Sequence, residues 1–260
     1  MNLRKLTVLA FLVFTSAVVY TTTEATVFGV RLPPVVTPLV TLLCFLFAVL
    51  HSADRFGWKR SLLLLGLTFT VSLFFECIGV ATGKVYGPYH YTDLLGPKFL
   101  GLVPLLIPSA WFMMMYPSFV ITTRVIPQQW QGGARLVGTA AVGALVMTAW
   151  DLVMDPLMVA GGYWVWDVEG AYFGIPPQNY GGWWLTSFIT FTLFLILGGT
   201  ALTEGEPHSA WFDQLAVASY LIIGLSNIIF VTSVGMGGPG VVGLFAMLPW
   251  VLLGWNAKGS

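Results

Sequence analysis

The segment "GALVMTAWDLVMDPL" (residues 143–157) has the composition of a membrane-spanning helix but contains two acidic side chains. Asp151 and Asp155 are four residues apart, so on a helix they lie one above the other on a single face. A carboxyl group at membrane depth is costly to insert, and such acids are functional candidates by default. The two acids therefore make this helix a candidate for the functional site of the chain.

The composition predicts an integral membrane protein. The chain has 260 residues, of which 57% are hydrophobic and only 8% are charged, and its mean hydropathy is +0.84. An average soluble domain carries about 25% charged residues. The formal net charge is zero, which argues against nucleic acid as a partner.

Apolar runs near the roughly 20-residue spanning length recur along the whole chain. They predict an all-α, polytopic helical bundle of about eight transmembrane helices, forming a single integral membrane domain over residues 1–260. Self-similarity between the two halves is not evident, so an inverted-repeat transporter has no support from repeats. The predicted helices are 4–22, 35–53, 59–80, 101–122, 134–154, 182–202, 211–233 and 240–255.

The basic start and apolar run of residues 1–20 also fit a cleaved signal peptide. We expect a retained first helix instead, because the rest of the chain is membrane-embedded as well.

Small residues recur in the predicted helix 134–154 and indicate close packing of this helix against a neighbour. They are Ala134, Gly138, Thr139 and Gly143.

The distribution of basic residues predicts a multi-pass protein of the cell (plasma) membrane with a cytoplasmic N-terminus. With that orientation only Arg31, Lys84 and Lys98 fall on the outer side. The cytoplasmic segments carry Arg4, Lys5, Arg55, Lys59, Arg60, Arg124, Arg135 and Lys258.

The same orientation brings three acids towards the non-cytoplasmic face. Glu76 lies about one turn before the outer end of the predicted helix 59–80, and Asp151 lies at a similar depth in the helix 134–154. This face also receives the two most aromatic loops, residues 83–97 and 161–184.

Two interpretations of these acids remain open. Each could be structural, hydrogen-bonded to a neighbouring helix or paired with a base such as Lys84. Alternatively, burial disfavours the charged form of a carboxyl group, so that a buried acid keeps its proton near neutral pH and serves as a general acid. Asp155 has a third interpretation, because an Asp-Pro pair often begins a helix, with Asp as the N-cap.

The aromatic loops also allow two interpretations. Tyrosine and tryptophan form interfacial belts in many membrane proteins without binding any ligand. An aromatic-walled cleft at the bilayer surface would instead suit a long apolar ligand that enters from the lipid, and ring faces can stabilise a passing cation.

Motifs for cofactors and covalent catalysis are missing from the sequence. It has no glycine-rich phosphate loop, no dinucleotide fingerprint and no G-x-S-x-G nucleophile elbow. Cys44 and Cys77 stand singly in apolar stretches, which favours neither a disulfide nor a thiolate metal site. The sequence therefore predicts a site of acids and aromatic residues, with no cofactor and no metal.

Three ordered motifs resemble the carotenoid-biosynthesis hydratase family, which includes bisanhydrobacterioruberin hydratase and bacterial hydratases of lycopene and γ-carotene ends. The motifs are "FFECIGVATGKVYGPYHYTDLLGPKFLGLVPLLIPSAW" (74–111), "AWDLVMDPLMVAGGYWVW" (149–166) and "GAYFGIPPQNYGGWW" (170–184). The resemblance covers the region 74–188. The first two and last two predicted helices carry no matching motif.

The resemblance implies a hydro-lyase of the carotenoid 1,2-hydratase type. Such an enzyme adds water across the terminal C1–C2 double bond of a linear or monocyclic carotenoid and forms a tertiary alcohol without a redox change. We expect Glu76, Asp151 and Asp155 to be catalytic, with Asp151 and Glu76 as the acid–base pair in either order and Asp155 as their modulator. The expected substrate-binding residues are Tyr86, Tyr89, Tyr91, Trp150, Tyr163, Trp164, Trp166, Tyr172, Asn179 and Trp183.

The expected substrate is lycopene, γ-carotene or a bisanhydrobacterioruberin-like carotenoid taken from the membrane lipid. Other enzymes of the carotenoid pathway are considered as partners. Three alternatives stay open: an end-group cyclase that starts with the same protonation, a small proton-coupled transporter, and a non-catalytic carotenoid-binding protein. The presence of Asn179 and Gln178 favours the hydratase over the cyclase, because their amides could position water.

Overall fold

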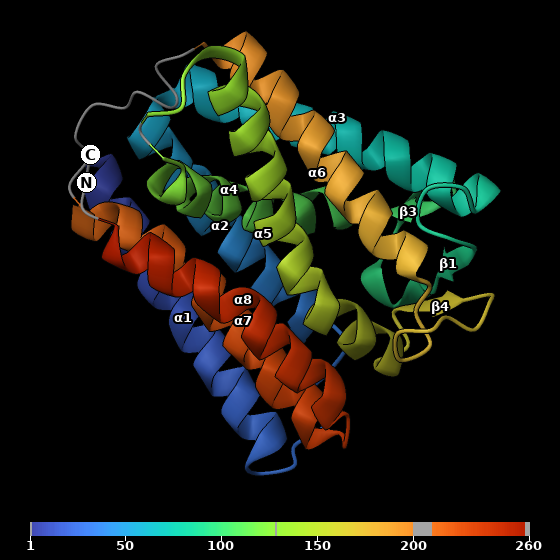
Figure 1. The fold of residues 1–260 in the computed structure, drawn as a ribbon. Helices are drawn as coiled ribbons and strands as arrows, with labels where there is room; N and C mark the ends of the chain where they lie inside the picture. Colours follow the sequence, from blue (N-terminus) through green and yellow to red (C-terminus); the bar gives the residue numbers. More distant parts are fainter. Residues whose placement is uncertain (1, 128, 200–209, 258–260) are drawn as a thin grey trace.

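Eight long helices dominate the computed structural model, which describes residues 2–127, 129–199 and 210–257 (Figure 1). The helices are α1 (Leu3–Thr26), α2 (Val36–Phe56), α3 (Trp58–Thr82), α4 (Ile107–Val125), α5 (Gly132–Ala160), α6 (Pro177–Gly198), α7 (Ala210–Ser233) and α8 (Gly237–Asn256). The short elements between them are β1 (Tyr89–Tyr91), η1 (Asp93–Leu95), β2 (Lys98–Phe99), β3 (Val103–Pro104) and β4 (Trp164–Trp166).

Helix α4 is the centre of the bundle. Every residue from Ile107 to Thr122 is buried except Ala110, and the helix packs against α2, α3, α5, α7 and α8. In the described part of the chain, the other seven helices are all long and apolar enough to cross a membrane. The polytopic helical membrane bundle predicted from hydropathy is therefore confirmed.

Three predicted helix boundaries differ from the structure by five or six residues, for local reasons. The helix predicted to begin at residue 101 begins at Ile107, because the apolar run first forms the β2–β3 hairpin, with Gly101 at a φ of +71°. The helix predicted to begin at residue 182 begins at Pro177, since proline is well suited to the first helical turn. Residues 200–202 at the other end of that predicted helix, like Lys258 of the topology argument, lie outside the described residues.

The third boundary is the end of α5, and its position changes the interpretation of Asp155. The helix predicted to end at residue 154 continues to Ala160, with Pro156 inside it. Asp155 is thus an interior helical residue, and its interpretation as a helix cap is wrong.

Glycines set the close approach of α5 to its neighbours. A Cβ atom at Gly143 would lie 2.8 Å from the ring of Phe191 on α6, and one at Gly243 of α8 would lie 2.6 Å from Cβ of Val153 on α5. Gly138 instead packs beneath the ring of Trp130, which precedes α5. The small residues predicted to allow tight helix packing do so at Gly143.

One end of the bundle is ionic. Asp213 of α7 accepts a hydrogen bond from Nε of Arg55 at 2.8 Å and lies 3.6 Å from Arg124, and Arg4 pairs with Asp54 at 2.7 Å. These contacts join α1, α2, α4 and α7 at the end where α2 finishes and α3 begins.

The other end of the bundle holds a two-stranded antiparallel sheet made from loops distant in the sequence. β1 follows α3, β4 follows α5, and they pair with Tyr89 opposite Trp166 and Tyr91 opposite Trp164 (Figure 1). A backbone hydrogen bond from Asp167 N to Pro88 O extends the ladder. Because side chains alternate along a strand, the four aromatic residues share one face, while His90 and Val165 point outwards and are exposed.

The contact between α5 and α8 generates a stability prediction. Replacing Gly243 with alanine should lower the unfolding free energy by about 1–3 kcal/mol, because the new methyl group overlaps the β-branched Val153 and forces α8 away. The measurement is the thermal unfolding midpoint of the purified protein in detergent.

Gly66→Ala on α3 is the matched control. A Cβ atom at Gly66 meets nothing within 4 Å, so this change should leave the midpoint unchanged or raise it slightly. Equal midpoints for Gly243→Ala and Gly66→Ala would contradict the packing argument.

Candidate active site

A cavity of about 440 Å³ lies between the helices, towards the end of the bundle that carries β1 and β4. Its volume is within the range of small-molecule sites. Side chains from α1 to α7 and from both aromatic loops line it, and most of them are apolar. Among the described lining residues the carboxyl groups are those of Glu76 and Asp155, and lysine, arginine and histidine are missing from the wall.

Glu76 of α3 is held entirely by neutral donors. Its Oε2 accepts hydrogen bonds from the hydroxyl groups of Tyr89 and of Tyr91, the latter at 2.9 Å. Its Oε1 accepts one from Nε1 of Trp111 on α4 at 3.0 Å. The side chain is only 3% exposed, and its partners do not include Lys84.

The two tyrosines are fixed as donors by their surroundings. Burial, and then the charge of Glu76, raises the pKa of Tyr89 and of Tyr91 well above the ordinary value of 10. Both phenols therefore keep their protons across the physiological range. An indole N–H can only donate, so all three contacts donate hydrogen bonds to the carboxyl group of Glu76.

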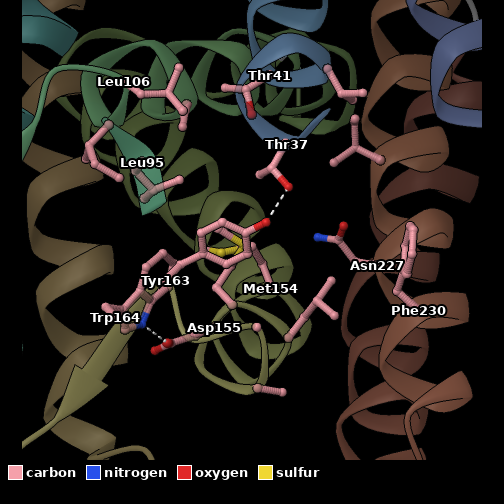
Figure 2. Close-up of a pocket in the computed structure, with 18 of the residues that line it drawn as sticks. Thr37, Thr41, Leu95, Leu106, Met154, Asp155, Tyr163, Trp164, Asn227 and Phe230 are labelled. Atoms are coloured by element: carbon pink, nitrogen blue, oxygen red, sulfur yellow. Dashed lines mark hydrogen bonds between the residues drawn. The ribbon is translucent and has the colours of Figure 1, made fainter. Parts of the chain in front are cut away.

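Asp155 and Asp151 meet at the amide of Asn179. Nδ2 of Asn179, at the start of α6, donates to Oδ2 of Asp155 at 2.7 Å and to Oδ2 of Asp151 at 2.9 Å. Asp155 also accepts a hydrogen bond from Nε1 of Trp164 at 2.6 Å (Figure 2). Oδ1 of Asp151 is buried without a hydrogen-bond partner among the described residues.

Tyr86 fixes the spacing between the helices that carry these groups. Its ring lies between Gly79 of α3 and Gly182 of α6, where a Cβ atom would approach ring carbons to 2.6 Å and 2.5 Å. Its hydroxyl group hydrogen-bonds to Oγ1 of Thr186 at 2.8 Å. A side chain larger than hydrogen at either glycine would displace this ring, so the spacing of α3 and α6 is set by it.

Aromatic rings form two walls of the cavity. The first comes from the β1–β4 pair, where Tyr89 and Trp166 have ring centroids 5.1 Å apart and Tyr91 and Trp164 are 5.8 Å apart. The second is helical: Trp111 stacks on Trp183 at 4.1 Å, and Trp150 meets Trp183 edge-on at 6.0 Å. These rings belong to the cavity wall rather than only to an outer interfacial belt.

Most of the residues predicted from the sequence gather at this cavity, but not in the predicted pairs. Asp151 is fully buried behind the wall, and its partner is Asn179 rather than Glu76. Tyr172 also lies off the wall and donates to Leu152 O, while Gln178 bonds to the carbonyls of Gly83 and Lys84. The predicted residues on the wall are Glu76, Tyr86, Tyr89, Tyr91, Trp150, Asp155, Tyr163, Trp164, Trp166, Asn179 and Trp183.

Sequence reasoning missed many residues of the wall, including the three that follow. Trp111 ends the first family-like motif, and its position in a run of apolar residues gave no sign of a contact to Glu76. Thr37 of α2, which bonds to the hydroxyl of Tyr163 at 2.6 Å, and Asn227 of α7 lie outside all three motifs. A polar amide within a predicted membrane helix was the available signal for Asn227.

Comparison with known proteins adds an independent observation. The model of a family described as "Carotenoid biosynthesis protein" matches residues 36–249. Bisanhydrobacterioruberin hydratase of Haloarcula japonica is 35% identical to the chain over 120 residues, which are 46% of this chain and 39% of that protein. The matched stretch is thus less than half of the relative's length. No solved structure matches the chain.

The family match spans α2 to α8 almost completely, and therefore includes every carboxyl group and aromatic ring of the site described above. Since it covers well over half of the sequence, the chain belongs to the carotenoid biosynthesis protein family.

Proposed function

We propose that the protein is a carotenoid hydratase that adds water across the terminal C1–C2 double bond of a linear or monocyclic carotenoid. The observation that carries this proposal is the pair of carboxyl groups, Glu76 and Asp155, on one aromatic-walled cavity whose described lining has no basic side chain. The printed name of the Haloarcula japonica relative, a hydratase, supports the same reaction class.

In the first step Asp155 is the general acid. Its O–H bond breaks as the π electrons of the alkene form a new C–H bond at C2, leaving a tertiary cation at C1. Two ionised carboxylates bonded to one amide would repel each other, so a proton retained on the Asp151–Asp155 pair relieves that repulsion. Asp155 is the member of the pair on the cavity wall.

The cation is then held by negative charge and by ring faces. The carboxylate of Glu76 lies on the same wall, and Trp164, Trp166 and Tyr89 present aromatic surface to the cavity. Cation–π attraction is worth about 2 kcal/mol or more when water is excluded. Preorganised groups of this kind need no rearrangement as the charge develops.

Water completes the reaction. Its oxygen forms a bond to C1, and one of its protons passes to the carboxylate of Glu76, which gives the neutral tertiary alcohol. Transfer of that proton back to Asp155 through solvent restores the starting state. The sum is addition of one water with no change of oxidation state, so the proposal calls on no redox cofactor.

Asp151 acts in this scheme as a positioning residue. It accepts a hydrogen bond from the same amide nitrogen of Asn179 as Asp155 does, and so helps to keep that donor directed at the acid. Asp151 would then influence the protonation of Asp155 without touching the substrate.

The proposal includes a setting for the protein in the membrane. We assign residues 1–260 to one integral membrane domain in the cell membrane, with a cytoplasmic N-terminus and the aromatic loops on the non-cytoplasmic side. Lycopene, γ-carotene or a bisanhydrobacterioruberin-like carotenoid would enter the cavity from the lipid, and other enzymes of the pathway would supply or remove it.

The reaction is tested by expressing the chain in bacteria that accumulate lycopene or γ-carotene. The expected result is a pigment heavier by one water for each modified end, measured by mass spectrometry of extracted carotenoids. Unchanged pigment across both substrates would refute the hydratase. A product of unchanged mass but altered chromatographic retention would identify an end-group cyclase instead.

Substitution of the acids separates catalysis from positioning. Asp155→Asn should lower the turnover number by about 10²–10⁴-fold, because the general acid is lost. Asp151→Asn should cost less and should shift the pH profile of turnover, because it alters the neighbour of Asp155. Thermal unfolding in detergent confirms that both variants fold, and full activity of Asp155→Asn would remove this residue from the mechanism.

The Glu76→Gln variant tests the addition of water separately from the protonation of the alkene. Because Asp155 is intact, the alkene is still protonated. Without the base that accepts a proton from water, however, the cation more often loses a proton and re-forms the alkene than it adds water. In D₂O, recovered substrate should therefore carry deuterium at C2 while hydration falls by at least about tenfold. Asp155→Asn is the comparison, with neither deuterium nor product. Hydration at the wild-type rate in Glu76→Gln would contradict the role of Glu76.

A further inference from the structure

The cavity extends beyond the carboxyl groups to a second polar region. Asn227 of α7 lines the cavity, and its side chain projects into it on the side of Tyr163 away from Asp155 and Trp164 (Figure 2). Its amide makes no hydrogen bond to any other described residue. It lies within a helix whose length and composition fit a membrane span.

Helix α2 contributes hydroxyl groups to the same region. Thr37 and Thr41 are four residues apart, so they lie on one face of α2, and both line the cavity. Thr37 is bonded to the hydroxyl of Tyr163 at 2.6 Å. Thr41 is only 8% exposed, and within the described chain its hydroxyl group has no hydrogen-bond partner. Figure 2 shows Thr37 and Thr41 extending from α2 while Asn227 extends from α7.

The unpaired polar groups of Asn227 and Thr41 indicate which chemical group a bound ligand should carry. An unpaired amide or hydroxyl group removed from water costs about 1–3 kcal/mol, which a ligand that completes its hydrogen bonds would recover. The amide of Asn227 both donates and accepts, and so does the hydroxyl of Thr41. With no charged side chain nearer on the described wall than Asp155 and Glu76, the complementary group is neutral and both donates and accepts, as a hydroxyl group does.

We propose that Asn227 and Thr41, supported by the Thr37–Tyr163 pair, form a subsite that binds a hydroxyl group carried by the isoprenoid ligand. The isoprenoid nature of the ligand rests on the proposed function. The subsite gives the enzyme a preference for chains that already carry oxygen, since a hydrocarbon leaves both polar groups unpaired. It is separate from the carboxyl groups that carry out the hydration.

The test compares binding of phytanol and phytane, saturated branched chains that differ by one hydroxyl group. Neither contains an alkene, so binding is measured without any reaction and stays informative even if the hydratase proposal fails. The purified protein in detergent micelles is titrated with each probe while tryptophan fluorescence is followed, because Trp150, Trp164 and Trp183 line the cavity.

The wild-type protein is expected to bind phytanol about five- to tenfold more tightly than phytane, as one or two neutral hydrogen bonds allow. Asn227→Leu should abolish this preference and leave phytane binding unchanged, and Thr41→Val should reduce it. Ser226→Ala is the matched control on α7, because its hydroxyl is already bonded to Ile223 O, and it should retain the full preference.

Two results would overturn the proposal. Equal binding of the two probes by the wild-type protein would mean that water alone satisfies Asn227 and Thr41. A preference that survives both Asn227→Leu and Thr41→Val would place the hydroxyl recognition elsewhere. Since Thr41→Val is nearly isosteric, it decides the matter even if Asn227→Leu does not fold.

Discussion

Three carboxyl groups buried among membrane helices, with only neutral donors as partners, constrain the rest of this structure. Glu76 accepts hydrogen bonds from two phenols and an indole, and Asp151 and Asp155 share one amide. Removing a carboxylate from water costs several kcal/mol unless hydrogen bonds replace the lost hydration. Because the partners come from α4, α6 and the two aromatic loops, satisfying the acids requires those segments to converge.

This convergence explains the architecture around the cavity. The β1–β4 pair brings the tyrosines that bind Glu76 together with the tryptophan that binds Asp155, although the two strands are distant in the sequence. The ring of Tyr86, held between two glycines, sets the distance between the helix of Glu76 and that of Asn179. The aromatic wall and the hydrogen-bonded acids therefore form one structural unit, as the cation chemistry proposed above requires.

Much of the fold could be predicted from the sequence, because hydropathy is a property of whole segments. About 20 apolar residues in a row identify a membrane helix regardless of its neighbours. Local exceptions arose where an apolar run folds into the β2–β3 hairpin before Ile107, and where α5 continues through Pro156. In the first place the turn at Gly101 lies within the apolar run itself, and in the second the helix continues past a proline that would often end it.

The site could be predicted only in part, for a related reason. Most of its aromatic residues and acids were recognisable by type and by the loops that carry them, but hydrogen-bond partners depend on tertiary contacts. The depth of Asp151 suggested a pair with Glu76, whereas both aspartates bond to Asn179 and Asp155 is the one that lines the cavity. The contact from Trp111 to Glu76 spans 35 residues, and no local pattern announces it.

The alternation of side chains in β1 and β4 has a practical consequence. Tyr89, Tyr91, Trp164 and Trp166 face the cavity, while His90 and Val165 sit directly opposite each other on the outer surface. Spin labels or fluorophores attached at these two outer positions would be rigidly coupled to the cavity wall without entering it. The outer face of the β1–β4 pair is thus suited to carry a spectroscopic probe of ligand binding. The aromatic residues that line the cavity would stay unchanged.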